Sequence, residues 1–155
     1  MRYLRCALPI LAAPMFSTAV MPADSGNSDF AGSWQMDAQK SQVEDGRVVT
    51  LTIENVSNKI KLVRVIRDKE GKEARSQFVC AAGGAECDFD EAGNKAKVSV
   101  WYNGPALVML KTAGPKEDAS DEWTMKLSPD KRTLTVALEH IDPAAKDETL
   151  VFSKK

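Results

Sequence analysis

The chain has 155 residues, of which 43% are hydrophobic and 28% charged, and its formal net charge is −1. This length and composition are typical of one globular domain. The nearly balanced charge argues against nucleic acid and anionic membrane surfaces as partners, because both require a basic face.

Residues 1–19 have the pattern of a secretory signal peptide. Two arginines give a positive start, an uncharged and mostly apolar stretch follows over residues 6–16, and Ser17 and Ala19 are small residues at a cleavage site. The apolar stretch is too short for a membrane span, which needs about 20 residues. We therefore expect an exported protein, periplasmic or secreted, that is cleaved after Ala19 or, alternatively, after Ala23.

A polar linker over residues 24–29 leads into a single domain, residues 30–155, in which hydrophobic residues recur at every second position. This alternation is typical of strands with one buried and one solvent-exposed face. We count eight strong runs between Arg47 and Lys154, and a short one at Ser33–Met36. Short turn sequences between the runs favour antiparallel connections. The clearest alternation covers residues 49–54, 60–67, 74–80, 96–100, 123–127 and 133–138.

So many antiparallel strands must protect their edges from pairing with other chains. Closure of the sheet into an up-and-down barrel removes every edge. The sequence therefore predicts an all-β fold, an antiparallel up-and-down β-barrel of about eight strands. A two-sheet β-sandwich is the structural alternative.

Two of the three cysteines lie within the predicted domain, Cys80 and Cys87, with Gly83 and Gly84 between them. An even pair in an exported chain predicts a disulfide, and the double glycine lets the chain turn back. A zinc site needs more Cys or His ligands than this pair and the single His140 provide. We expect a structural disulfide, no metal site and no cofactor.

A short tryptophan motif, which contains Gly32 and Trp34, lies at the start of the domain, just before the long series of predicted strands. It resembles the Gly-x-Trp signature at the first strand of lipocalins and related calycin barrels, and the chain as a whole is similar to uncharacterised exported bacterial lipocalin-like proteins. The resemblance implies a lipocalin-like barrel in which Gly32 and Trp34 have structural roles and close one end. The matching positions are Phe30, Gly32, Trp34, Asp37, Lys40 and Ser41, and later Trp123, Leu127, Ser128, Asp130, Thr133–Thr135 and Leu150–Phe152.

The sequence lacks the residue patterns of common active sites. His140 is the sole histidine, and no Gly-x-Ser-x-Gly elbow, HExxH motif, phosphate-binding loop or dinucleotide fingerprint accompanies it. The acidic run Asp88–Glu91 lacks the ligand number and spacing of a calcium loop, and a solvated hairpin end explains it better. We therefore expect a protein that is not an enzyme.

Four side chains are candidates for the lining of a binding cavity: Arg64, Tyr102, Trp123 and His140. Arg64, Trp123 and His140 share the parity of the apolar positions on their strands, although the strand of Arg64 is apolar on both faces, which leaves its orientation open. Tyr102 and its neighbour Trp101 face opposite ways, so one of them should line the interior. An interior guanidinium needs a charged partner or an anionic ligand, which makes Arg64 an anchor for a carboxylate.

Two functions fit this description. One is an exported barrel that binds a small apolar or amphipathic molecule in its interior. The other is a filled barrel that serves as a structural or protein-interaction module. Interior positions are mostly Val, Leu and Ile with few aromatics, which favours a cavity and hence ligand binding. The sequence leaves the oligomeric state open.

Overall fold

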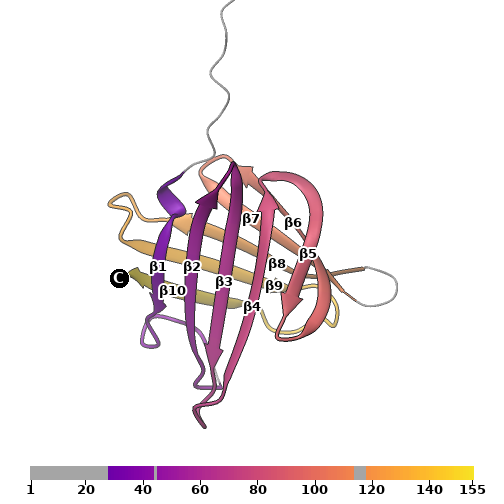
Figure 1. Cartoon of the computed structure of the whole chain (residues 1–155). Coiled ribbons are helices and arrows are strands. Elements are labelled where there is room, and N and C mark those ends of the chain that lie inside the picture. Colours follow the sequence, from indigo (N-terminus) through magenta and orange to yellow (C-terminus); the bar gives the residue numbers. More distant parts are fainter. Residues whose placement is uncertain (1–27, 44, 114–117) are drawn as a thin grey trace, which may run out of the picture.

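The described residues of the computed structural model are 28–43, 45–113 and 118–155, so the predicted signal peptide and the linker up to residue 27 lie outside them. They form ten antiparallel strands closed into a barrel, in which β1 also pairs with β10 (Figure 1). A 3₁₀ turn, η1 (Ser28–Phe30), precedes them. The strands are β1 (Gly32–Met36), β2 (Val48–Val56), β3 (Lys59–Arg67), β4 (Glu73–Ala81), β5 (Gly83–Glu91), β6 (Asn94–Asn103), β7 (Ala106–Ala113), β8 (Asp118–Leu127), β9 (Thr133–His140) and β10 (Glu148–Lys154).

The closed barrel confirms the predicted up-and-down architecture over the sandwich alternative. The strand number is ten where the sequence predicted about eight. The main difference is β5, whose residues the sequence analysis assigned to a glycine turn and an acidic hairpin end. Its first four residues are exposed and only Phe89 is fully buried, so alternation is almost absent from this strand.

The two ends of the barrel differ in what fills them. Large hydrophobic side chains fill the end at which η1 enters, which we call the packed end, and Trp34 lies there with none of its surface exposed. The even-numbered strands begin at the opposite end, which we call the open end. In Figure 1 the steep strands β1–β4 form one wall, and β7–β9 cross behind them. The largest buried side chains are Trp34, Phe30, Phe89, Phe152, Leu51, Ile53, Leu62, Leu107, Met109, Met125, Leu134 and Leu150.

Contacts around Trp34 join η1, β1 and β10 at the packed end. The indole Nε1 of Trp34 donates a hydrogen bond to the carbonyl of Phe30 at 2.9 Å. The ammonium of Lys154, on β10, lies 5.1 Å from the centre of the Trp34 ring, a cation–π distance. Gly32 has φ of +146°, and a Cβ there would stand 2.7 Å from Cε of Lys154. The glycine therefore leaves the space through which Lys154 reaches Trp34.

The pairing of β4 with β5 is short for strands of this length. Only three register pairs join them, and Phe78 opposite Phe89 is the last. Cys80 and Cys87 stand two residues further along each strand, directly opposite each other in the same register. They form the disulfide with a Cα–Cα distance of 5.8 Å, which confirms the predicted pairing. The disulfide thus joins β4 and β5 where their ladder ends, a place we call the β4–β5 seam.

Candidate ligand-binding site

A cavity of about 460 Å³ lies inside the open end. Its volume falls in the range of small-molecule sites, which combine an apolar wall with a few polar groups. The apolar wall consists of Val49, Ile66, Trp123, Leu138 and Leu150. The polar wall consists of Asp45, Arg47, Arg64, Glu91, Asp121, His140 and Glu148.

A second hollow, of about 620 Å³, adjoins this cavity, and we call it the mouth. Residues of the β1–β2 and β9–β10 connections line it. Asp45, Arg47, His140 and Glu148 line both the cavity and the mouth, so these four residues form the rim between them. The interior of the barrel is therefore reached from the surface between the two connections.

Strand register brings the first polar row together. Arg64 on β3 lies opposite Ser76 on β4, which lies opposite Glu91 on β5, so the three side chains are nearest neighbours on one face. Arg64 Nη2 donates to Glu91 Oε1 at 2.9 Å and to Ser76 Oγ at 3.4 Å. Its guanidinium also lies 5.0 Å from the ring centre of Trp123. Arg64 therefore points inward, an orientation that the sequence left open, and it has an internal carboxylate partner.

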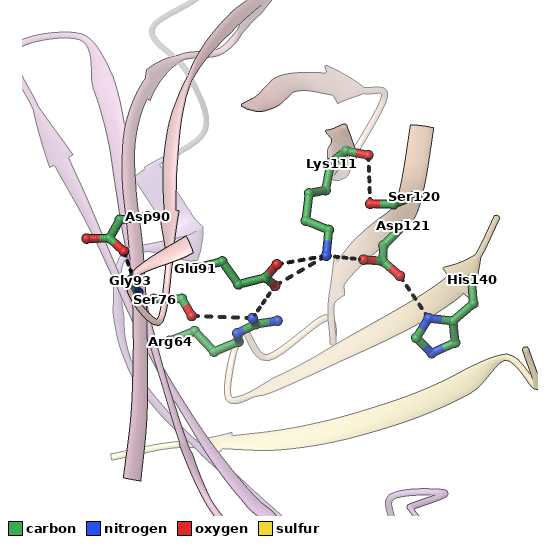
Figure 2. A network of polar contacts seen from close by, with 9 residues as sticks. All are labelled: Arg64, Ser76, Asp90, Glu91, Gly93, Lys111, Ser120, Asp121 and His140. Carbon is green, nitrogen blue, oxygen red and sulfur yellow. Dashed lines mark hydrogen bonds and ion pairs between the residues drawn. The ribbon is translucent and has the colours of Figure 1, made fainter. Parts of the chain in front are cut away.

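A second polar row joins the other side of the barrel to the first. Lys111 on β7 lies opposite Asp121 on β8, which lies opposite His140 on β9. Lys111 Nζ lies 2.6 Å from Asp121 Oδ2 and 3.0 Å from Glu91 Oε2, so it bridges the two rows across β6 (Figure 2). His140 Nδ1 lies 2.8 Å from Asp121 Oδ1. The result is one continuous network from Arg64 to His140.

The network keeps Asp121 ionised inside the barrel. Burial opposes ionisation, but the hydrogen bonds and charge interactions that Asp121 makes with Lys111 and His140 together outweigh it. The pKa of Asp121 therefore lies below its ordinary value.

A separate set of ion pairs stands at the rim. Arg47 Nη1 lies 2.7 Å from Asp45 Oδ2, and Arg47 Nη2 pairs with Glu148 Oε2. Glu148 lies opposite Leu138 on β9, and His140 follows two residues later on the same face. Glu148 and His140 are therefore diagonal neighbours beside the opening, with their Cα atoms roughly 7–8 Å apart.

The structure brings three of the four predicted ligand-binding residues together. Arg64, Trp123 and His140 all line the cavity. Tyr102 does not line it, because it stands near the end of β6 at the packed end, where its ring centre is 6.3 Å from that of Phe30. Residue parity predicts which face of a strand a side chain occupies, but it does not predict at which end of the barrel the side chain lies.

The sequence analysis missed the charged partners of Arg64 and His140. Asp121 shares parity with the buried Trp123, so alternation was a signal that could have found it. Lys111 had no such signal, because residues 106–109 of its strand are buried on both faces. Glu91 had no such signal, because β5 shows almost no alternation.

The chemistry available in the cavity is that of hydrogen bonding and charge. Of the described residues that line it, none is a serine, threonine or cysteine that could act as a nucleophile beside His140. Within the described ranges, no group of three or more His, Cys, Asp or Glu side chains is arranged to hold a metal ion. The same ranges contain no helix that is long and apolar enough to cross a membrane.

Comparison with solved structures assigns the fold to the calycin-like β-barrels. The fluorescent protein UnaG matches with a TM-score of 0.57 at 16% identity, over 82% of this chain and 98% of that one. The zebrafish ileal bile acid-binding protein complexed with cholic acid matches with a TM-score of 0.54 at 14% identity, over 83% and 100%. Human cRBP IV gives a TM-score of 0.55 at 13% identity, over 83% and 100%.

These identities are low, so the similarity shows the fold. It confirms the barrel class that the resemblance at Gly32 and Trp34 implied. No protein-family model matches the chain, and no curated protein matches it in sequence.

Proposed function

We propose that the barrel binds a small, partly apolar molecule in the cavity at its open end. The observation that carries the proposal is the cavity itself, about 460 Å³ with one apolar and one polar wall, in a barrel whose other end is densely filled. A module that acted only through its surface would be more stable with a filled interior, since cavities and partly buried charges both lower stability. The filled-module alternative accounts for the packed end but not for this cavity.

The apolar wall supplies the affinity in this proposal. Trp123, Leu138 and Leu150 are all buried and present adjacent apolar surfaces on β8, β9 and β10. Burial of about 200 Å² of apolar ligand surface contributes about 5 kcal/mol before the cost of association. Micromolar affinity corresponds to about −8 kcal/mol after that cost, so a tightly bound ligand must bury more apolar surface than this and also make charged or hydrogen-bonded contacts.

The polar network would hold the wall in place around the ligand. Arg64 lies against the ring of Trp123 and is fixed by Glu91, so the indole has a defined position before a ligand arrives. Such preorganisation reduces the ordering cost of binding. A similar barrel, the zebrafish bile acid-binding protein, was solved in complex with an amphipathic molecule, cholic acid, which supports the same use of the fold here.

We also propose that the protein works outside the cytoplasm and binds without catalysis. The signal-peptide pattern of residues 1–19 and the Cys80–Cys87 disulfide support export, because disulfides persist in oxidising compartments. The cavity lining offers polar groups that orient a ligand rather than a nucleophile that would attack it.

A titration with the neutral fluorescent probe N-phenyl-1-naphthylamine tests the binding proposal. Wild-type protein should bind the probe saturably, and Val49→Trp should weaken binding at least tenfold, because Val49 is buried and points into the cavity. Val48→Trp is the matched control, since Val48 is the adjacent residue and faces outward. Circular dichroism confirms that each variant is folded. Absence of saturable binding to the wild type, or equal binding by a folded Val49→Trp, would overturn the proposal.

A further inference from the structure

We propose that the ligand carries an amine or another cationic, hydrogen-bond-donating head group, and that this head group binds at the rim beside Glu148 and His140. The inference rests on the proposed function, because it assumes a ligand in the cavity. It concerns the class of ligand, which the fold does not determine.

The first step is that the two arginines that line the cavity, and Lys111 beside them, each have a carboxylate partner. Lys111 Nζ lies 2.6 Å from Asp121 Oδ2, 3.0 Å from Glu91 Oε2 and 3.3 Å from Glu91 Oε1. An ammonium has three N–H donors, so these three contacts use all of them. Arg64 is paired with Glu91, and Arg47 with Asp45 and Glu148. An anionic head group would have to compete with these internal carboxylates for the same cations.

Arg64 Nε is the one donor in this set that is both buried and without a hydrogen bond among the described residues. Because that nitrogen is itself closed off from solvent, a ligand in the cavity reaches it only if the surrounding side chains move. The guanidinium of Arg64, which the sequence indicated as an anchor for an anionic ligand, is therefore already paired with Glu91 and partly shielded.

The second step is that acceptors remain open at the rim. Glu148 uses Oε2 for Arg47, and its Oε1 makes no hydrogen bond among the described residues. His140 holds its Nδ1 against Asp121 Oδ1. A carboxylate can only accept, so Nδ1 carries the proton, and in the neutral ring Nε2 is left as an acceptor. Both side chains line the cavity and the mouth, so a ligand entering the barrel passes both.

The third step is the charge of the site. Four carboxylates, those of Asp45, Glu91, Asp121 and Glu148, belong to the cavity wall, against Arg47, Arg64 and the bridging Lys111. Among these seven side chains, the carboxylates outnumber the cations by one. A cationic head group corrects this imbalance, and an anionic one increases it. The effect is larger in a partly enclosed site than in bulk water.

The geometry of β9 and β10 accommodates such a ligand. Glu148 and His140 are diagonal neighbours around Leu138, which they flank from two sides. An ammonium placed between them can donate to both, while its chain continues inward along Leu138 and Trp123. The head group then stays near water, which lowers its desolvation cost.

Three probes with the same dodecyl chain test the proposal by displacement of N-phenyl-1-naphthylamine: dodecylamine, dodecanoate and dodecanol, each below its micellar concentration. We expect dodecylamine to bind at least tenfold more tightly than dodecanoate, with dodecanol between them. Dodecanoate binding as tightly as dodecylamine would overturn the head-group proposal and leave the binding function intact. Failure of all three chains to displace the bound probe would also overturn it, whereas failure of the probe itself to bind would refute the binding function.

Glu148→Gln assigns the effect to the rim. This variant removes the carboxylate charge and should reduce dodecylamine affinity at least fivefold with little change for dodecanol. Glu139→Gln is the matched control, because Glu139 precedes His140 and is exposed on the outer face, so it makes the same change of net charge outside the cavity. Equal amine affinity in Glu148→Gln and wild type would contradict the assignment. If Glu148→Gln does not fold, His140→Phe, which removes the Nε2 acceptor, should show the same selective loss.

Discussion

Lys111 and Asp121 stand at the centre of the polar network, and each depends on the other. Their side chains expose only 14% and 17% of their surfaces, so neither charge is well solvated by bulk water. A partly buried charge is tolerated when a partner and hydrogen bonds compensate for its desolvation. Lys111 meets two carboxylates, and Asp121 meets a lysine and a histidine, so the open end tolerates charge in its interior.

The low pKa of Asp121 leads to a prediction about acid stability. Because this pKa is lower in the folded chain than in the unfolded chain, unfolding takes up a proton, and the stability it contributes is lost as pH falls through the folded pKa. The free energy of unfolding should therefore decline from neutral pH to below about pH 4, the ordinary range of an aspartate. Asp121→Asn should be less stable at pH 7 by about 1–3 kcal/mol and should lose less on acidification.

Urea denaturation of both proteins at pH 7 and pH 3 measures this difference. The prediction concerns the change between the two pH values, to which other aspartates with lowered pKa, such as Asp37 and Asp130, contribute equally in both proteins. An identical loss in wild type and Asp121→Asn would show that the network does not stabilise the ionised carboxylate.

At the scale of the elements, the strands that could be predicted are those with strict alternation. The pattern along β2 and β9, with Val49, Leu51 and Leu134 buried, leaves only one arrangement of faces. β5 could not be predicted in this way, because its exposed first half carries two glycines and no buried apolar residue. The residues of the site divide in the same way, into those that alternation predicts and those that it does not. Trp123 and His140 were found by parity, whereas the Arg64–Glu91 pair depends on the register of three strands.

The β4–β5 seam yields a second prediction. The disulfide closes a loop with a sequence separation of 7, for which the entropic stabilisation is about 2 kcal/mol. Replacing both Cys80 and Cys87 by alanine should lower the melting temperature by several degrees and leave a folded barrel, since the other strand pairs are intact. Thermal unfolding followed by circular dichroism measures the shift. Thiol labelling of the native exported protein should detect no free cysteine, and two reactive thiols would contradict the Cys80–Cys87 disulfide.

At the scale of the whole molecule, the barrel divides its interior between stability and binding. The packed end buries the large apolar side chains around Trp34, and this core supplies most of the hydrophobic stabilisation. The open end carries the cavity and the ion pairs, where residues are free to serve recognition. This division explains why a motif of structural residues, Gly32 and Trp34, identified the fold without indicating the ligand.

Export is a property of the whole chain, and residues 1–27 lie outside the described ranges. The predicted cleavage makes a definite mass prediction for protein isolated from the exported fraction. Its first residue should be Val20, or Asp24 with the alternative site. Intact-mass spectrometry reads this directly, and a mass that retains residues 1–16 would contradict the signal-peptide interpretation.

The claim that a ligand occupies the open end is tested most directly by nuclear magnetic resonance of the three tryptophan indole groups. Trp123 lines the cavity, Trp34 is sealed in the packed end, and Trp101 lies on the outer face of β6. During titration with N-phenyl-1-naphthylamine, the indole N–H signal of Trp123 should shift saturably while the other two stay in place. A saturable shift at Trp101 or Trp34 without one at Trp123 would contradict binding in this cavity.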